Sequence, residues 1–180
     1  MKIDIVIPKN NEQEILDMAI QLGFKELIFL YTDLNKKPLV LKSDKIKLYT
    51  AGLAMQTKDV DKAGKNYDFV FGPAQRAFFE NKKIKYLVNA ETDEKKDFLY
   101  QKRAGLDDVM CRLAKEKNQI IVFNMQIIAE KPLVLARMVQ NAKLCRKYKV
   151  DFLAASFATS PLEMRSPIDI DGFSRMIKLL

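Results

Sequence analysis

The sequence contains no histidine among its 180 residues. Histidine is the general base of Ser-His-Asp and Cys-His catalysis and a frequent ligand of zinc. Its absence therefore excludes both catalytic arrangements, imidazole general bases and zinc sites that use histidine.

Cysteine and glycine are also scarce. The two cysteines, Cys111 and Cys145, form no Cys-x-x-Cys motif, and we predict reduced thiols in the core. None of the six glycines lies in a G-x-G-x-x-G or G-x-x-x-x-G-K-[ST] motif, which argues against a nucleotide cofactor. No long apolar run occurs near the start, where Ile3, Ile5 and Ile7 alternate with other residues. We therefore expect no signal peptide or membrane span and a cytoplasmic location.

Positive charge is plentiful. Lysine and arginine total 31 against 23 aspartates and glutamates, which gives a net charge of +8. Such an excess favours a polyanionic partner, although a soluble basic protein from a lysine-rich proteome explains it equally well. With 48% hydrophobic residues, the chain is predicted to fold as one globular domain over residues 1–180.

Segments with strand and helix patterns alternate along the chain, which predicts a mostly parallel sheet covered by helices. Hydrophobic patterning predicts strands at residues 2–7, 26–31, 39–41, 45–53, 68–71, 85–88, 119–123 and 151–155. Helices are expected after Asn10 or Asn11 up to Gly23, at 74–81, 106–114 and 132–148, and from Ser166 onward. Residues 56–66 are expected to form a loop, and 91–97 a solvated turn. Periodicity alone leaves a compact barrel and an open, doubly wound sheet as alternatives.

The predicted helix at 132–148 carries the strongest functional signal. Residues 131–149 include no acidic residue. Helical spacing places Val134, Leu135, Met138, Ala142 and Cys145 on an apolar arc, and Arg137, Gln140, Lys143, Arg146 and Lys147 on the other side. A solvated face usually mixes signs, so a surface of one sign favours contact with phosphates.

Further cations and aromatic residues are candidates for RNA contact. Lys102 and Arg103 precede the helix at 106–114, and Arg165 follows a predicted strand. The guanidinium groups suit phosphate oxygens, although ion pairs with carboxylates explain Arg103 and Arg165 equally well. The tyrosines that are candidates for stacking on bases are Tyr49, Tyr67, Tyr100 and Tyr148, while most aromatic residues are better explained as core.

The carboxylates form no catalytic pattern. Asp4, Asp68 and Asp151 lie near strand ends, but no paired motif occurs there. Helix capping explains the Ser160-x-x-Glu163 spacing and Asp169, three residues after Ser166. We therefore predict no catalytic and no metal-binding residue. Two alternatives stay open: a metal-dependent phosphoesterase that uses Asp4 or Asp68, and a scaffold whose basic face binds an acidic protein.

Three segments resemble one protein family. They are residues 103–115 (RAGLDDVMCRLAK), residues 136–148 (ARMVQNAKLCRKY), and residues 154–156 (AAS) followed by 160–167 (SPLEMRSP). In this order and spacing they are similar to the thirty-kilodalton protein subunit family of archaeal and eukaryotic ribonuclease P. The similarity is specific over residues 101–180. The chain is shorter than most members, which leaves open a trimmed barrel, and Phe157-Ala158-Thr159 replaces the smaller residues usual in the family.

The resemblance implies a small α/β fold like a TIM barrel, related to polymerase-and-histidinol-phosphatase domains but without their metal chemistry. It implies an RNA-binding, non-catalytic subunit of an endoribonuclease that removes the 5′ leader from precursor tRNA, with Mg²⁺ held by the catalytic RNA. The implied partners are the ribonuclease P RNA, precursor tRNA through the complex, a small ferredoxin-like subunit and other ribonuclease P proteins.

Overall fold

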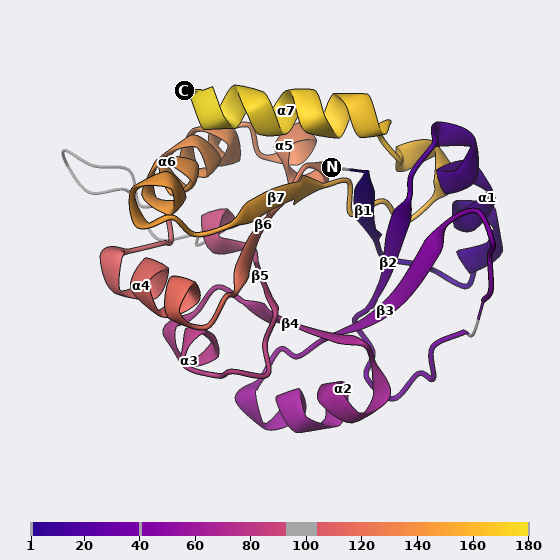
Figure 1. Ribbon diagram of the computed structural model, residues 1–180, viewed down its shortest axis with the longest axis horizontal. Coiled ribbons are helices and arrows are strands. Elements are labelled where there is room, and N and C mark those ends of the chain that lie inside the picture. Colours follow the sequence, from indigo (N-terminus) through magenta and orange to yellow (C-terminus); the bar gives the residue numbers. More distant parts are fainter. Residues whose placement is uncertain (1, 40, 93–103, 180) are drawn as a thin grey trace.

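The computed structural model describes residues 2–39, 41–92 and 104–179. Seven parallel strands follow one another in sequence order around a ring, with the helices outside it (Figure 1). The strands are β1 (Ile3–Val6), β2 (Glu26–Tyr31), β3 (Lys47–Leu53), β4 (Phe69–Pro73), β5 (Tyr86–Val88), β6 (Ile120–Asn124) and β7 (Phe152–Ala155).

Main-chain hydrogen bonds join the two ends of this sheet. The chain beyond β7 continues along β1, where the Phe157 N–H donates to the Ile5 carbonyl and the Ile7 N–H donates to the Ala158 carbonyl, both at 2.9 Å. The predicted barrel is therefore confirmed, and the open doubly wound sheet is excluded. Seven strands are present in the described chain, one fewer than the eight of a TIM barrel.

Strand side chains alternate between two cores, as the pleat requires. The inner core consists of strand residues and their extension, including Ile28, Phe71, Val122 and Phe157, and fills the barrel. The outer core packs the alternate strand residues, such as Leu27 and Phe29, against the helices. Cys111 and Cys145 are buried in this outer core as free thiols, as predicted.

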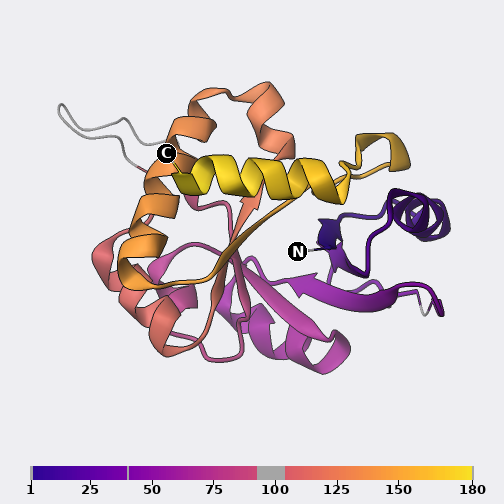
Figure 2. The same cartoon turned by 45° about the horizontal axis from the view of Figure 1, so that its top comes forward.

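The helices cover the outside of the barrel. They are α1 (Glu12–Leu22), α2 (Val60–Asn66), α3 (Arg76–Phe79), α4 (Asp108–Glu116), α5 (Gln126–Glu130), α6 (Leu133–Tyr148) and α7 (Pro167–Leu179), with short 3₁₀ turns η1 (Thr57–Asp59), η2 (Ala90–Thr92) and η3 (Pro161–Glu163). Figures 1 and 2 show α7 spanning one side of the barrel, from the neighbourhood of α1 to that of α6. No described helix is both long and apolar enough to cross a bilayer.

Two predicted helix ends agree with the structure. Gly23 ends α1 in the left-handed region, with φ of 81°. Helix α4 begins two residues later than expected, because Asp107, predicted inside the helix, caps it: its carboxylate accepts a hydrogen bond from the Met110 N–H at 2.7 Å. Ser166 and Asp169 bond reciprocally at the start of α7, which is the predicted capping box.

Several predictions about local structure are wrong. Residues 56–66 form η1 and α2 and not a loop, because Val60 and Ala63 are buried one helical turn apart. Leu39 and Leu41 belong to no strand, because β2 pairs directly with β3 and no further strand can lie between them. The helix expected at 74–81 shortens to α3. Glu91, expected in a solvated turn, has no exposed surface.

Candidate nucleic-acid interface

Helix α6 buries one side against the barrel and its neighbouring helices. Its buried residues include Val134, Met138, Ala142 and Cys145, as the helical spacing predicts. Asn141 is also buried, and its Nδ2 donates to the Ala104 carbonyl at 2.7 Å. This bond fixes α6 against the segment that leads into α4, so the basic side of α6 has a defined orientation.

The exposed side of α6 carries Lys143, Arg146 and Lys147. Within residues 2–39, 41–92 and 104–179, neither Lys143 nor Arg146 forms an ion pair. Lys147 lies 3.7 Å from the Asp108 carboxylate on α4. Its pKa is raised by the neighbouring Tyr148 hydroxyl and then by Asp108, so it stays protonated. Although residues 131–149 contain no acidic residue, α4 thus supplies a carboxylate that partly offsets the positive charge of α6 at Lys147.

Arg137 occupies a different environment. Its side chain is half-buried, and Nη1 donates to the Glu91 carbonyl at 3.3 Å, which ties α6 to η2. The structure thus gives Arg137 a packing partner, and the exposed cations of α6 begin at Lys143.

The structure does not bring all the predicted contact residues together. Arg165 is exposed in the segment between η3 and α7. Figure 1 shows that this segment leads into the end of α7 near α1, away from α6. Arg165 forms no ion pair with any described residue. Lys102 and Arg103 lie outside the described residues.

Sequence patterning missed a hollow of about 660 Å³ between α4, α6, α7 and the start of β7. We call it the α6–α7 hollow. Its cationic lining residues, all exposed, are Lys115, Arg146, Lys149, Arg175 and Lys178. Asp151 and Asp171 also line it, and Asp171 pairs with Arg175 at 2.6 Å. Five cations from three helix ends and the loop before β7 thus outnumber two carboxylates, which makes the hollow a site suited to phosphate groups.

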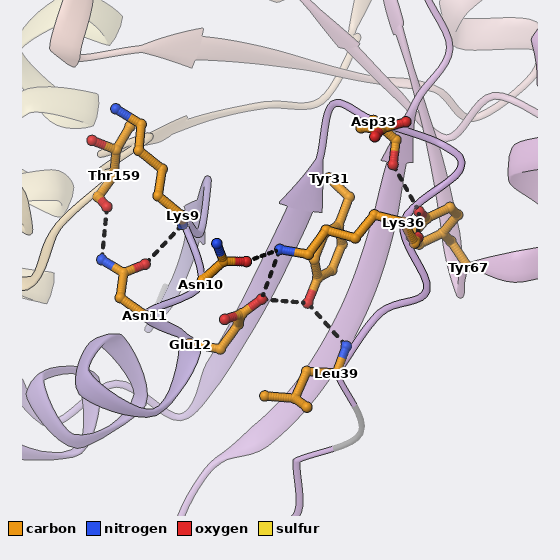
Figure 3. Close-up of polar contacts among 10 residues, drawn as sticks. All are labelled: Lys9, Asn10, Asn11, Glu12, Tyr31, Asp33, Lys36, Leu39, Tyr67 and Thr159. Atoms are coloured by element: carbon orange, nitrogen blue, oxygen red, sulfur yellow. Dashed lines mark hydrogen bonds and ion pairs between the residues drawn. The ribbon is translucent and has the colours of Figure 1, made fainter.

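The carboxyl-terminal end of the barrel, where barrel enzymes place their catalytic groups, holds a closed polar network. Figure 3 shows Glu12 between Tyr31 and Lys36: the Tyr31 hydroxyl donates to its carboxylate at 3.3 Å, and Lys36 Nζ lies 3.8 Å away. Lys36 also donates to Asn10 Oδ1 at 2.6 Å. Burial raises the pKa of Tyr31 to about 12, so the hydroxyl stays protonated. The groups satisfy one another and leave no activated nucleophile.

Two other buried carboxylates have different surroundings. Asp4 is fully buried, and its oxygens accept from Ser156 N at 2.7 Å, Ser156 Oγ at 2.6 Å and Ile5 N at 2.8 Å. Burial raises its pKa to about 6, although these hydrogen bonds oppose the rise. The Glu91 carboxylate forms no hydrogen bond with a described residue. Burial raises its pKa to about 7, although the backbone amides of Glu91 and Asn124 oppose the rise.

The carboxylates considered for metal binding lie apart. Asp4 bonds across the β1–β7 seam, whereas Asp68 is exposed before β4 and bonds to Thr50 of β3. Across the ranges that the structure describes, no three histidine, cysteine, aspartate or glutamate side chains come together as a metal site. The Ser160 hydroxyl makes no capping bond, because Glu163 accepts from Thr159 N at 2.7 Å instead.

Comparison with known proteins gives matches in structure only. No protein family matches the sequence, and no curated protein matches it. A chain in the cryo-EM structure of archaeal ribonuclease P with mature tRNA superposes with a TM-score of 0.75 at 20% identity, covering 98% of this chain and 84% of that one. Histidinol phosphate phosphatase from Lactococcus lactis, complexed with zinc, L-histidinol and phosphate, gives 0.68 at 11% identity, covering 99% and 92%. At these identities the likeness establishes the barrel fold.

Proposed function

We propose that this chain is an RNA-binding protein component of ribonuclease P, the endoribonuclease that removes the 5′ leader from precursor tRNA. The observation that carries the proposal is the exposed cationic surface of Lys143, Arg146 and Lys147 with the α6–α7 hollow. It lies on a chain whose whole described fold matches a chain of an archaeal ribonuclease P particle. The three segments that resemble the thirty-kilodalton subunit family point to the same particle, and two of them include most of α4 and most of α6.

The proposed role is electrostatic. Each lysine or arginine that meets a phosphate releases condensed counterions, so binding weakens steeply with salt. Neutralised phosphates repel one another less, which lets the RNA pack its catalytic part and hold Mg²⁺ at lower concentration. We propose that the chain acts in the cytoplasm and carries no cofactor or catalytic residue of its own. Its partners would be the ribonuclease P RNA, precursor tRNA through the complex, a small ferredoxin-like subunit and other ribonuclease P proteins.

The test replaces the exposed cations Lys143, Arg146 and Lys147 by glutamine in a reconstituted archaeal ribonuclease P. We expect cleavage of precursor tRNA to fall at limiting Mg²⁺ and to recover as Mg²⁺ rises, because added Mg²⁺ screens the same phosphates. A matched control replaces three exposed lysines on other elements, Lys37, Lys42 and Lys58, by glutamine. Equal activity of the two triple variants at limiting Mg²⁺ would refute the proposed role of α6.

A metal-dependent phosphoesterase remains the alternative, favoured by the likeness in fold to the phosphatase. The separation of Asp4 from Asp68 argues against it. Release of phosphate from p-nitrophenyl phosphate by the purified chain with Mg²⁺, Mn²⁺ or Zn²⁺, and its loss in Asp68→Asn, would support the enzyme instead. A scaffold for acidic proteins, the other alternative, predicts no salt-dependent binding to structured RNA in a filter assay.

A further inference from the structure

The two ends of the barrel differ in charge. Six of the seven strands have at least one lysine among the three residues before them; β4 has none, and β5 has two. These seven lysines are Lys2, Lys25, Lys45, Lys83, Lys85, Lys117 and Lys149, against the aspartates Asp44, Asp68 and Asp151. Within three residues after a strand, the charged residues are Lys9, Arg76, Asp33 and Glu91. Because all seven strands are parallel, the lysines gather at one end, which we call the amino-terminal rim.

Most of the amino-terminal rim is available to a ligand. All its lysines are exposed except Lys85 and Lys117, which are half-buried. Lys83 pairs with Asp61 at 2.7 Å, and Lys85 donates to the Asn118 carbonyl at 2.9 Å. In the described part of the chain, Lys2, Lys25 and Lys149 form no ion pair or hydrogen bond through their ammonium groups. They precede β1, β2 and β7, which are neighbours around the closed barrel.

The backbone conformation at Lys149 is one that lysine rarely adopts. Lys149 follows α6 in the left-handed region, with φ of 56°, where glycine is the usual residue. Its side chain lines the α6–α7 hollow, which opens at the same rim. Glycine would adopt this left-handed conformation at a lower free-energy cost than lysine does. Such strained residues are common where function constrains the choice of residue.

Aromatic rings lie inside the ring of lysines. Tyr49, Phe69 and Tyr86 face the barrel interior near the starts of β3, β4 and β5. The centroids of Tyr49 and Phe69 are 5.1 Å apart, and those of Phe69 and Tyr86 are 5.4 Å apart. Tyr49 and Phe69 are half-buried, so neither residue is fully covered. Lys47 Nζ lies 4.9 Å from the centre of the Tyr49 ring.

We propose that the amino-terminal rim seats an unpaired segment of RNA, with phosphates on Lys149, Lys2 and Lys25 and a base stacked on Tyr49. The inference rests on the proposed function and adds which end of the barrel the RNA covers. Surfaces that bind single-stranded nucleic acid commonly combine cationic side chains, which contact the phosphates, with aromatic side chains, which stack on the bases. An acidic protein would bind the same lysines, but its binding would give no role to the partly exposed aromatic residues beside them.

The test measures binding of ribonuclease P RNA and of a twelve-residue oligouridylate across a salt series. The rim variant combines Lys2→Gln, Lys25→Gln and Lys149→Gly. The last change removes the left-handed lysine, so it removes charge while easing folding. For oligouridylate we expect the slope of log Kobs against log salt concentration to become shallower by about 2. Each lost phosphate contact on a single strand contributes roughly 0.7, and the variant removes three lysines. The control is the triple change of Lys37, Lys42 and Lys58 to glutamine, and it should keep the wild-type slope.

Tyr49 gives a second, independent readout. Tyr49→Leu keeps an apolar side chain in the barrel but removes the ring, and we expect affinity for oligouridylate to fall roughly five- to hundred-fold, the range for one stacked base. Tyr49→Phe keeps the ring and should bind like the wild type.

The outcomes separate the two proposals. If the wild-type chain binds neither RNA, the proposed function itself fails. If it binds RNA and the α6 variant weakens binding, while the rim variant and Tyr49→Leu behave like the control, only the present inference is overturned. Salt-dependent binding to an acidic protein with no binding to oligouridylate would also overturn it.

Discussion

Glu91 is a single residue whose environment opposes its charge. Its carboxylate is fully buried and forms no hydrogen bond with a described residue. Burial raises its pKa from 4.5 to about 7, although the backbone amides of Glu91 and Asn124 oppose the rise. A native-state pKa above the unfolded value means that the folded protein binds the proton more tightly. The stability that protonated Glu91 contributes is present below pH 4.5 and is lost as pH rises through 7.

Glu91→Gln should therefore stabilise the protein above neutral pH. The amide carries no charge to desolvate, so we expect unfolding at pH 8 to cost about 1–3 kcal/mol more in the variant than in the wild type. At pH 5 the difference should largely vanish. Urea denaturation at pH 8 and at pH 5 measures this difference in unfolding free energy. The control is Glu116→Gln, a change at an exposed residue on α4. A variant no more stable than the wild type at pH 8 would show that the Glu91 charge is compensated.

At the scale of one element, α7 begins with a reciprocal cap. Asp169 N–H donates to Ser166 Oγ at 3.2 Å, while Ser166 Oγ donates to the Asp169 carboxylate at 2.8 Å. Ser166→Ala should cost about 1 kcal/mol of unfolding free energy, because the N–H and the carboxylate both lose a partner. Ser160→Ala provides the matched comparison, since its hydroxyl makes no capping bond to η3. It should stay within about 0.5 kcal/mol in the same urea titration. Equal losses would mean that both serines act as caps.

The strands and the long helices were predictable from sequence, whereas the short helix α2 was not. The bounds of β2 agree with the prediction residue for residue, and α4, α6 and α7 differ from it by at most a few residues. Helix α2 was missed because its seven residues bury only Val60 and Ala63, too few to show a period above the surrounding charges. Glu91 was placed in solvent because it begins a polar run, whereas η2, which contains it, packs against α6.

For the whole molecule, the composition predicted a basic surface but not its assembly. Lys143, Arg146 and Lys147 share a helix, so helical spacing identified them. Lys115, Arg175 and Lys178 join Arg146 only where α4 and α7 pack beside α6, and no local pattern encodes that contact. Likewise, the lysines of the amino-terminal rim lie together only because the strands are parallel and the barrel is closed.

Closure of the barrel depends on a seam that one carboxylate holds together. Asp4 of β1 accepts three hydrogen bonds, two of them from Ser156 beyond β7. Asp4→Ala leaves the Ser156 N–H and hydroxyl buried without this acceptor, and we expect it to cost roughly 3 kcal/mol or more in urea denaturation. Asp151→Ala, an exposed change just before β7, should have little effect.

The loss of stability caused by Asp4→Ala should also depend on pH and should be concentrated at the seam. Burial raises the pKa of Asp4 from 3.8 to about 6, so its contribution to stability is fully present below pH 3.8 and declines as pH rises through 6. The cost of the alanine should therefore be larger at pH 5 than at pH 7.5. Hydrogen exchange should quicken first at Ile7 and Phe157, whose amides bridge the seam, while the β5–β6 pairing keeps its protection. Uniform loss of protection would mean instead that the seam opens only with the whole barrel, since seven strands would then unfold as one unit.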